Sequence, residues 1–262
     1  MNEPILGVIP ARLDSSRLPR KPLHPVLGRP LLEWVWQRVQ PMTLFDHVVV
    51  ATDSAEVVAL CESIGAPVIL TAAEHPSGTD RVAEVARRPE FRHLPIVVNV
   101  QGDEPLVRES HLVRAVELVR DQGWEVGTCA APLVNAGARK DPSVVKVARA
   151  TNGRALYFSR AAIPHKRDDK PTPEEMAAAP FLRHIGVYAY RRDALLRWVS
   201  LPPSPLEELE RLEQLRALED GMAMGVAVVD EARPGVDTAA DVLKMEELLS
   251  RMDEPLIAAK GT

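Results

Sequence analysis

The sequence predicts an α/β fold built on a mostly parallel sheet covered by helices. The first observation is that short runs of apolar, often β-branched residues alternate with longer segments of helical periodicity along the first half of the chain. The second is that these runs are continuously apolar, as in parallel strands buried on both faces. A hydrophobic content of 46% and a charged content of 26% are ordinary for a soluble globular protein of this class.

The first half of the chain supplies strands and helices in alternation. Five apolar runs are expected to be strands: Ile5–Ile9, His47–Thr52, Pro67–Leu70, Ile96–Val100 and Val126–Ala131. Four segments between them have helical patterns: Pro30–Gln40, Ser54–Ile64, Gly78–Arg87 and Glu109–Gln122. Strands that alternate with helices in this way indicate βαβ units.

The pattern changes after residue 140. Asn152-Gly153 separates two β-rich runs, Val144–Ala150 and Ala155–Ser159, and an Asn-Gly pair in that setting predicts a hairpin. The following stretch, Pro164–Pro180, is rich in Lys, Asp, Pro and Glu and is interpreted as a surface loop.

Four further elements close the chain. His184–Tyr190 is expected to be a strand, and Met224–Val229 a late strand. Between them, five leucines recur at every third position from Leu206 to Leu218 and predict one helix with an apolar stripe. The last helix is expected at Ala239–Met252, followed by a disordered tail at Asp253–Thr262.

Length and composition limit the function classes. The 262 residues suit a single domain over residues 1–252, with the hairpin in a lobe at about residues 140–220. A net charge of −5 argues against a nucleic-acid-binding surface. No secretory signal and no apolar run long enough to cross a membrane stand out. Two isolated cysteines, Cys61 and Cys129, fit a reducing cytoplasm.

The most informative segment is the basic stretch Pro10–Leu23, which follows the first expected strand. It contains four cations, Arg12, Arg17, Arg20 and Lys21. Ligands of open α/β sheets bind at the carboxyl ends of the strands, so these cations suit a polyanion such as a triphosphate. The alternative is a solvated basic loop.

Two aspartates are candidate metal ligands. Asp103 follows Gly102 where the strand Ile96–Val100 should end, at the same sheet edge as the basic loop. The alternative is a turn aspartate that bonds its own backbone. Asp237 precedes a helix, where Thr238 and Asp241 resemble a capping pair, so a purely structural role is also open for this residue.

Other polar positions are ambiguous when taken alone. Ser77 or Thr79 could cap the helix that begins at Gly78 or bind a ligand with free backbone N–H groups. His184 and Tyr188 share one face of a strand, where they could line a pocket or only pack. Signatures of P-loop ATPases, Rossmann dehydrogenases and serine hydrolases are absent from the sequence.

The ordered set of motifs is far more specific than any one of them. It comprises Pro10–Leu23, Ser77-Gly78-Thr79, Asn99–Pro105, Tyr157–Ala161 with Ile163-Pro164, Phe181–His184 with Gly186 and Tyr188, Pro203–Glu207, Leu212–Arg216 and Gly235–Thr238. In this order the motifs resemble the 3-deoxy-manno-octulosonate cytidylyltransferases, also called CMP-Kdo synthetases. The resemblance extends from Ile9 to about Leu248.

This resemblance implies a nucleotide-diphospho-sugar transferase-like (Rossmann-like) fold with a hairpin or dimerisation lobe, and a homodimer. It implies a Mg²⁺-dependent nucleotidyltransferase that converts CTP and Kdo into CMP-Kdo and pyrophosphate for lipopolysaccharide biosynthesis. The residues that it assigns are Arg12, Arg17 and Lys21 to the triphosphate, Ala11, Ser77 and Gln101 to the cytidine, Asp103 and Asp237 to the metal, and Arg160, His184, Tyr188, Glu213 and Gln214 to the sugar acid. Arg12, Lys21, Asp103 and Asp237 form the implied catalytic set.

Some positions depart from the family pattern. Arg20 stands where a glycine is common, so it either adds a phosphate contact or points to solvent. His165-Lys166 replaces a frequent Trp-Asp pair near the expected sugar loop, which leaves the acceptor open. The alternatives are a cytidylyltransferase for another 2-keto sugar acid, of the 8-amino-Kdo or sialic acid type, and a non-catalytic nucleotide-binding protein on the same fold.

Overall fold

The computed structural model describes residues 3–13, 15, 17–133, 136–167, 170–176 and 180–252. The chain divides into two compact units, each assembled from three stretches. Unit 1 contains Met1–Gly7, Ala86–Asn99 and Arg108–Ala232, and unit 2 contains Val8–Val85, Val100–Val107 and Arg233–Thr262. Strand β1 (Ile5–Pro10) begins in unit 1 and ends in unit 2.

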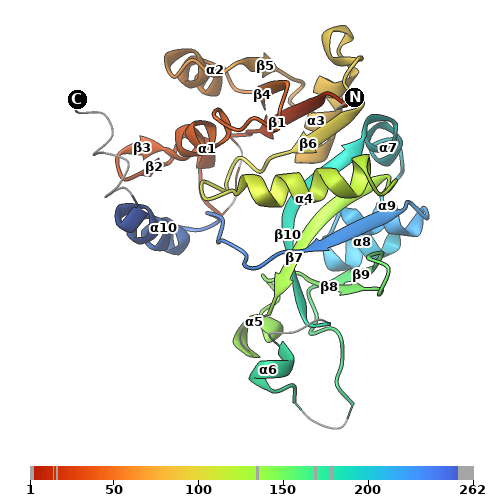
Figure 1. Cartoon of the computed structure of the whole chain (residues 1–262). Coiled ribbons are helices and arrows are strands. Elements are labelled where there is room, and N and C mark those ends of the chain that lie inside the picture. Colours follow the sequence, from red (N-terminus) through yellow and green to blue (C-terminus); the bar gives the residue numbers. More distant parts are fainter. Residues whose placement is uncertain are drawn as a thin grey trace. The chain divides into compact units, whose positions relative to one another are not determined.

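Unit 2 begins with parallel strands and their helices. The strand order is β1-β4-β5, and β4 (His47–Thr52) pairs in parallel with β5 (Val68–Leu70). The helices of this unit are α1 (Leu31–Val39), α2 (Ala55–Ser63), α3 (Gly78–Arg87, whose last two residues fall in unit 1) and α10 (Ala239–Met252), with the short helix η1 (Lys21–Leu23) and the hairpin β2–β3 (Pro25–Val26 and Arg29–Pro30) (Figure 1).

Sequence periodicity explains how α1 and α10 pack. Leu31, Leu32, Val35, Trp36 and Val39 recur at helical spacing and are all buried. One core cluster of unit 2 joins residues from both ends of the chain: Leu18, Val26, Leu31, Leu106, Val236, Val242, Met245 and Leu249. The last helix is therefore part of the same hydrophobic core as the first forty residues.

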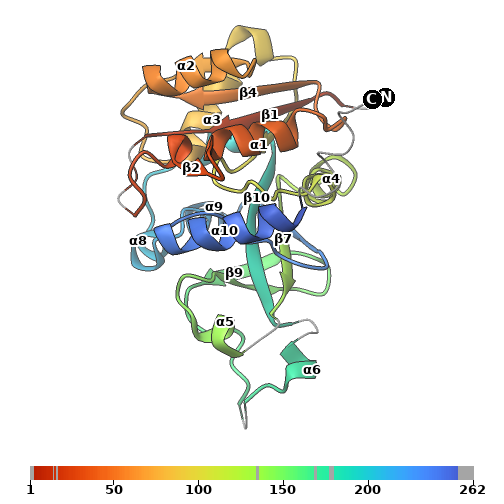
Figure 2. The ribbon, with the colours of Figure 1, turned by 90° about the vertical axis from the view of Figure 1, so that its left-hand side faces the viewer.

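Unit 1 is organised around the long strand β10 (Leu182–Arg191), which lies beside β7 in both views (Figures 1 and 2). It pairs antiparallel with β6 (Ile96–Asn99), β7 (Val126–Pro132) and β8 (Lys146–Arg149). β11 (Met224–Val228) pairs in parallel with β7. The helical elements of this unit are η2 (Pro89–Phe91), α4 (Glu109–Arg120), α5 (Ala136–Lys140), α6 (Pro173–Met176), α7 (Arg192–Trp198), α8 (Pro205–Glu210) and α9 (Gln214–Glu219).

The predicted α/β class, a mixed and mostly parallel sheet flanked by helices, is confirmed. The predicted hairpin is also confirmed: β8 pairs antiparallel with β9 (Ala155–Ser159), and the turn between them contains Gly153 at φ 97°. The Asn152 side chain accepts a hydrogen bond from Arg154 N at 3.1 Å, as expected for a turn asparagine.

The prediction of a single leucine-striped helix is wrong. Residues 205–219 form two short helices, α8 and α9, because Arg211 adopts the left-handed conformation at φ 53° and ends the first. A spacing of three residues also falls short of the 3.6-residue helical turn, so the leucines drift around the helix instead of forming a stripe. Leu209 is consequently 80% exposed, whereas Leu212 and Leu215 are buried.

The expected loop Pro164–Pro180 contains one short helix, α6. Residues 168–169 and 177–179 of this segment, and the tail at Asp253–Thr262, lie outside the described residues. Within the described ranges, no helix is long and apolar enough to cross a lipid bilayer.

Candidate functional site

The basic stretch Pro10–Leu23, called the basic loop below, follows β1, and the backbone of this loop is fixed at both of its ends. At the start, Ala11 N donates to Ala51 O of β4 at 2.8 Å, and Ala11 is buried. At the end, Arg20 adopts the left-handed conformation at φ 57° and caps the short helix η1, and His24 N donates to Lys21 O at 3.1 Å. Pro22 is buried in this turn. The backbone of Lys21 is therefore anchored, while its side chain extends into a pocket.

Asp103 is positioned by the close approach of two backbone segments, the turn at Gly102 and the end of β1 at Pro10. Val100 N donates to Val8 O at 2.9 Å, which continues the sheet edge beyond β6. A side chain at position 102 would place its Cβ 2.6 Å from Pro10 O, so only glycine fits there without a shift. Gly102 lets the chain turn beside the end of β1, and Asp103 follows directly.

Asp237 reaches the same place from the far end of the chain. Val236 N donates to Asp103 O at 2.9 Å, which ties the two aspartate segments together through their backbones. The expected capping pair is present: Asp241 N donates to Thr238 Oγ1 at 3.3 Å, and Thr238 N donates to Asp241 Oδ2 at 3.0 Å. Since Asp241 takes the capping role, the carboxylate of Asp237 is available to the pocket.

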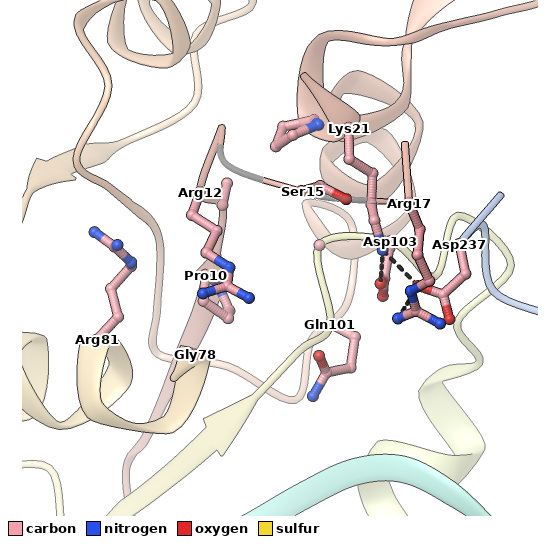
Figure 3. A pocket seen from close by; sticks show the side chains of 13 residues that line it. Pro10, Arg12, Ser15, Arg17, Lys21, Gly78, Arg81, Gln101, Asp103 and Asp237 are labelled. Carbon is pink, nitrogen blue, oxygen red and sulfur yellow. Dashed lines mark hydrogen bonds and ion pairs between the residues drawn. The ribbon is translucent and has the colours of Figure 1, made fainter. Parts of the chain in front are cut away.

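Lys21 joins the two aspartates. Its Nζ donates to Asp103 Oδ2 and to Asp237 Oδ1, each at 2.7 Å, and Arg17 pairs with the same oxygen of Asp237 at 3.0 Å. Figure 3 shows these side chains converging from three separate segments. Burial acts to lower the pKa of Lys21, but the charges and hydrogen bonds of Asp103 and Asp237 together outweigh it, so the pKa is raised. Lys21 is therefore a permanent cation at neutral pH.

These residues belong to one open pocket of about 280 Å³ within unit 2. Its lining residues are Pro10, Ala11, Arg12, Ser15, Arg17, Lys21, Pro22, Gly78, Arg81, Gln101, Gly102, Asp103 and Asp237. Arg12 is exposed, and no carboxylate of the described residues pairs with it. Figure 3 shows Arg81 and the aspartates on opposite sides of the view, with Arg12 and Gln101 between them. An elongated anion can therefore meet several cations along this pocket.

Two residues of the basic loop region have other roles. Arg20 points to α2, where its guanidinium makes two hydrogen bonds to the carboxylate of Glu56, and it does not line the pocket. Ser77 caps α3: its hydroxyl accepts from Asp80 N at 3.2 Å and donates to the Asp80 carboxylate at 2.6 Å. Gly78, not Ser77, is the residue of this motif that lines the pocket.

The residues implied for the sugar acid all belong to unit 1. Removal from water, and to a lesser degree the charge of Arg183, lowers the pKa of His184 to about 3, so its ring is neutral at neutral pH. Its Nε2 lies 2.9 Å from Thr128 Oγ1, and its ring lies 5.4 Å from that of Tyr188. The Tyr188 hydroxyl is buried and has no hydrogen-bond partner among the described residues. A buried hydroxyl of this kind calls for a partner.

Burial, with smaller contributions from Tyr190 and Glu213, raises the pKa of Tyr188 well above its ordinary value. The negative charge of Glu213 is thus one of the smaller influences on the Tyr188 hydroxyl. The next residue, Gln214, is buried at the start of α9 and is not a member of a solvated face.

Arg160 lies in a different hydrogen-bond network of unit 1. Its guanidinium donates to three backbone carbonyls, those of Pro142, Glu210 and Arg211. Its own carbonyl accepts a hydrogen bond from the ammonium of Lys146, which is fully buried and also donates to the carbonyls of Asp141 and Val144. Desolvation lowers the pKa of Lys146.

Sequence reasoning gave no role to Arg81 or Lys146. Arg81 is 2% exposed and is fixed by Thr71, the carbonyl of Ala72 and the carboxylate of Asp53, so it forms a rigid wall of the pocket. The sequence held a signal for Arg81, because this cation directly follows the Ser77-Gly78-Thr79-Asp80 motif, and Gly78 of that motif also lines the pocket. Lys146 is a lone cation within an apolar run, Val144–Ala148, which is the pattern of a buried charge with backbone partners.

Comparisons with known proteins agree with this geometry. The family model described as "Cytidylyltransferase" matches residues 6–224. A protein of Gemmatimonas aurantiaca named 3-deoxy-manno-octulosonate cytidylyltransferase is 51% identical over 242 residues, 92% of each chain. One of the same name from Syntrophotalea carbinolica is 45% identical over 249 residues, 92% of this chain and 97% of its own.

Solved structures give the same answer. A CMP:2-keto-3-deoxy-manno-octonic acid synthetase complexed with CTP matches with a TM-score of 0.86 and 38% identity, over 95% of this chain and 99% of its own. The fold is shared more widely: 4-diphosphocytidyl-2C-methyl-D-erythritol synthase of Anaerococcus prevotii matches with a TM-score of 0.62 at 11% identity, over 95% of this chain and 99% of its own. The motif order, the fold and the similarity along nearly the whole chain establish that the protein belongs to the 3-deoxy-manno-octulosonate cytidylyltransferase family.

Proposed function

We propose that this protein transfers the cytidylyl group of CTP to Kdo, giving CMP-Kdo and pyrophosphate for lipopolysaccharide biosynthesis. The observation that supports this most is the pocket of unit 2, where cations of the basic loop lie against a pair of aspartates in a member of the family. The CTP complex of the related solved structure supports the nucleotide.

Arg12, Arg17 and Lys21 hold the triphosphate in this proposal. Arginine presents a planar fork to phosphate oxygens and lysine a point charge, so the three cations neutralise and orient the chain of phosphates. Ala11, Ser77 and Gln101 are assigned to the cytidine, and Gly78, the neighbour of Ser77, lines the pocket. Orientation contributes much of the rate in phosphoryl-type transfers, where protein groups do little covalent work.

Asp103 and Asp237 are the residues that would hold Mg²⁺. Their fit is supported by the fact that both carboxylates already reach 2.7 Å from one cationic atom, Lys21 Nζ. Carboxylate oxygens are the donors that this hard ion prefers. No group of three or more His, Cys, Asp or Glu side chains forms a metal site within the described ranges, so the remaining ligands would be substrate oxygens and water. Bound there, Mg²⁺ would neutralise phosphate charge and lower the pKa of the attacking hydroxyl.

The sugar acid is assigned to Arg160, His184, Tyr188, Glu213 and Gln214 of unit 1. The buried Tyr188 hydroxyl supports this, because a sugar hydroxyl would supply its missing partner. A neutral His184 acts here as a hydrogen-bonding group and not as a charge. In the reaction, the anomeric 2-hydroxyl oxygen of Kdo bonds to the α-phosphorus, the bond to the bridging oxygen of the β-phosphate breaks, and the hydroxyl proton passes to solvent.

We further propose a homodimer in the cytoplasm. The cysteines bear on the compartment: both are buried and unbridged, and burial, followed by the charge of Glu62, raises the pKa of Cys61 to about 11, which suits an inert core thiol.

The homodimer is tested separately. Sedimentation or light scattering of the purified protein measures the oligomeric state, and a monomer at micromolar concentration would contradict the dimer.

The test of the function is pyrophosphate release by the purified protein with Mg²⁺, each of four nucleoside triphosphates and a panel of sugar acids that includes 8-amino-Kdo and sialic acid. Turnover is expected with CTP and Kdo. Turnover with a different sugar acid and not with Kdo would show that this other acid is the acceptor. CTP binding without turnover on any sugar acid would favour the non-catalytic alternative.

Asp103→Asn and Asp237→Asn are each expected to lower kcat by about a hundredfold or more, since each removes one charge from the metal ligands. Circular dichroism should be unchanged in both variants. Activity within a few-fold of the unmodified protein in either variant would exclude that residue from the metal site.

A further inference from the structure

The aspartate pair of the pocket already holds a cation that belongs to the protein. Lys21 Nζ lies 2.7 Å from one oxygen of Asp103 and 2.7 Å from one oxygen of Asp237. The Lys21 side chain is only 16% exposed, less than Asp103 at 30% and Asp237 at 43%. The side chain of Lys21 is therefore the most enclosed of the cluster, and Arg17 adds a second positive charge at 3.0 Å from Asp237.

An ammonium in this position excludes a divalent metal from the same two oxygens. The hydrogen bonds to Lys21 occupy the oxygens at distances typical of charged pairs. Mg²⁺ takes its ligands at about 2.0–2.1 Å, so a metal shared by these oxygens would lie within a few ångströms of the ammonium. Two cations that close repel strongly in a partly buried site.

We propose that Lys21 is the resident counter-ion of the Asp103–Asp237 pair in the nucleotide-free protein, and that a divalent metal binds this pair only when Lys21 leaves it for an incoming polyphosphate. Metal and nucleotide then bind together, and the metal does not bind first. The assignment of the polyphosphate to CTP rests on the proposed function, whereas the occupation of the aspartate pair by Lys21 does not.

The surroundings allow the side chain to move while the site stays intact. The backbone of Lys21 is fixed by the left-handed turn at Arg20 and by the hydrogen bond from His24 N, so only the flexible stem has to swing. The backbone segments of the two aspartates do not depend on Lys21 to stay together, because Val236 N donates to Asp103 O at 2.9 Å and the Thr238–Asp241 cap fixes the start of α10.

The experiment measures Mn²⁺ binding to the full-length protein without any nucleotide, by electron paramagnetic resonance of free Mn²⁺. Lys21→Met keeps the length of the side chain and removes its charge. This variant is expected to bind one Mn²⁺ at least tenfold more tightly than the unmodified protein, because the competing cation is gone. The double variant Lys21→Met with Asp103→Asn should lose this gain, which places the ion at the aspartate pair.

Arg20→Met is the matched control, since it removes a neighbouring cation that pairs with Glu56 outside the pocket. Its Mn²⁺ affinity should equal that of the unmodified protein. If Lys21→Met melts at a normal temperature but binds Mn²⁺ no more tightly, the proposal is wrong, and Lys21→Gln repeats the test should the methionine variant misfold. Turnover with CTP is measured separately on the unmodified protein, so failure of the proposed function is seen independently.

Discussion

At the scale of single residues, His184 makes the stability of the protein depend on pH. Its folded pKa of about 3 lies below the ordinary value of 6.5, so the unfolded chain binds a proton in this range and the folded protein does not. The stability that depends on this residue is fully present above pH 6.5 and is lost as the pH falls toward 3. The slope from one such group is at most about 1.4 kcal/mol per pH unit.

His184→Gln removes the titrating group and retains a partner for Thr128. Urea denaturation of both proteins at pH 7 and pH 5 measures the effect. The free energy of unfolding should fall by a smaller amount between these values in the variant than in the unmodified protein. Equal losses would mean that His184 titrates normally in the folded state.

Residue chemistry also shows how far the sequence could predict the site. Residue types and motif order predicted Arg12, Arg17, Lys21, Asp103 and Asp237 as one set, and the structure brings all five to one pocket. The double contact of Lys21 was not predictable, because it depends on a partner 216 residues away and on a side-chain conformation. Arg20 shows the same limit: its charge predicted a phosphate contact or solvent, but its left-handed backbone turns it to Glu56.

At the scale of elements, the turn that carries Gly102 and Asp103 lies so close to the end of β1 that position 102 has no room for a side chain. In Gly102→Ala the new Cβ would lie 2.6 Å from Pro10 O, so one of the two segments must shift. We expect a loss of about 1–3 kcal/mol in the free energy of unfolding and weaker CTP binding, measured by chemical denaturation and calorimetry.

Gly78→Ala is the matched control for this substitution, because its Cβ would meet the same residue, Pro10, but at an ordinary 3.5 Å from Cγ. Its stability should stay within about 0.5 kcal/mol of the unmodified protein. Similar losses in the two variants would show that the backbone at Gly102 is less restricted than the distance indicates.

Elements with clear periodicity were predicted well, and elements that depend on tertiary contacts were not. The bounds of α3 and α10 agree with the sequence because capping residues and apolar spacing are local signals. The leucine repeat gave one helix instead of two, since the conformation of Arg211 and the capping box of Ser204 and Glu207 decide where the chain turns. Strand order and the antiparallel pairing of β10 involve distant segments and were beyond local patterns.

At the scale of the whole molecule, unit 2 depends on residues from both ends of the chain. Removing everything after Ala232 deletes Asp237 and four buried apolar residues of the unit 2 core, Val236, Val242, Met245 and Leu249. At about 2 kcal/mol for each buried side chain, the loss is about 8 kcal/mol, comparable to the whole stability of a typical domain.

The truncated protein is therefore expected to bind no CTP and to expose apolar surface, as measured by calorimetry and by fluorescence of a hydrophobic dye. A chain ending at Met252 is the matched control, because it keeps all of α10 and every contact described for α10. CTP binding by the protein truncated at Ala232 would show that unit 2 forms without α10.

The meeting of Lys21 with Asp237 also has a consequence for synthesis on the ribosome. Lys21 is made 216 residues before Asp237, and all of Arg108–Ala232 is made in between. During most of translation, the basic loop and Asp103 exist without the segment that completes the pocket and covers the unit 2 core. We therefore expect the newly made chain to bind no nucleotide until the segment that carries Asp237 and α10 has been made.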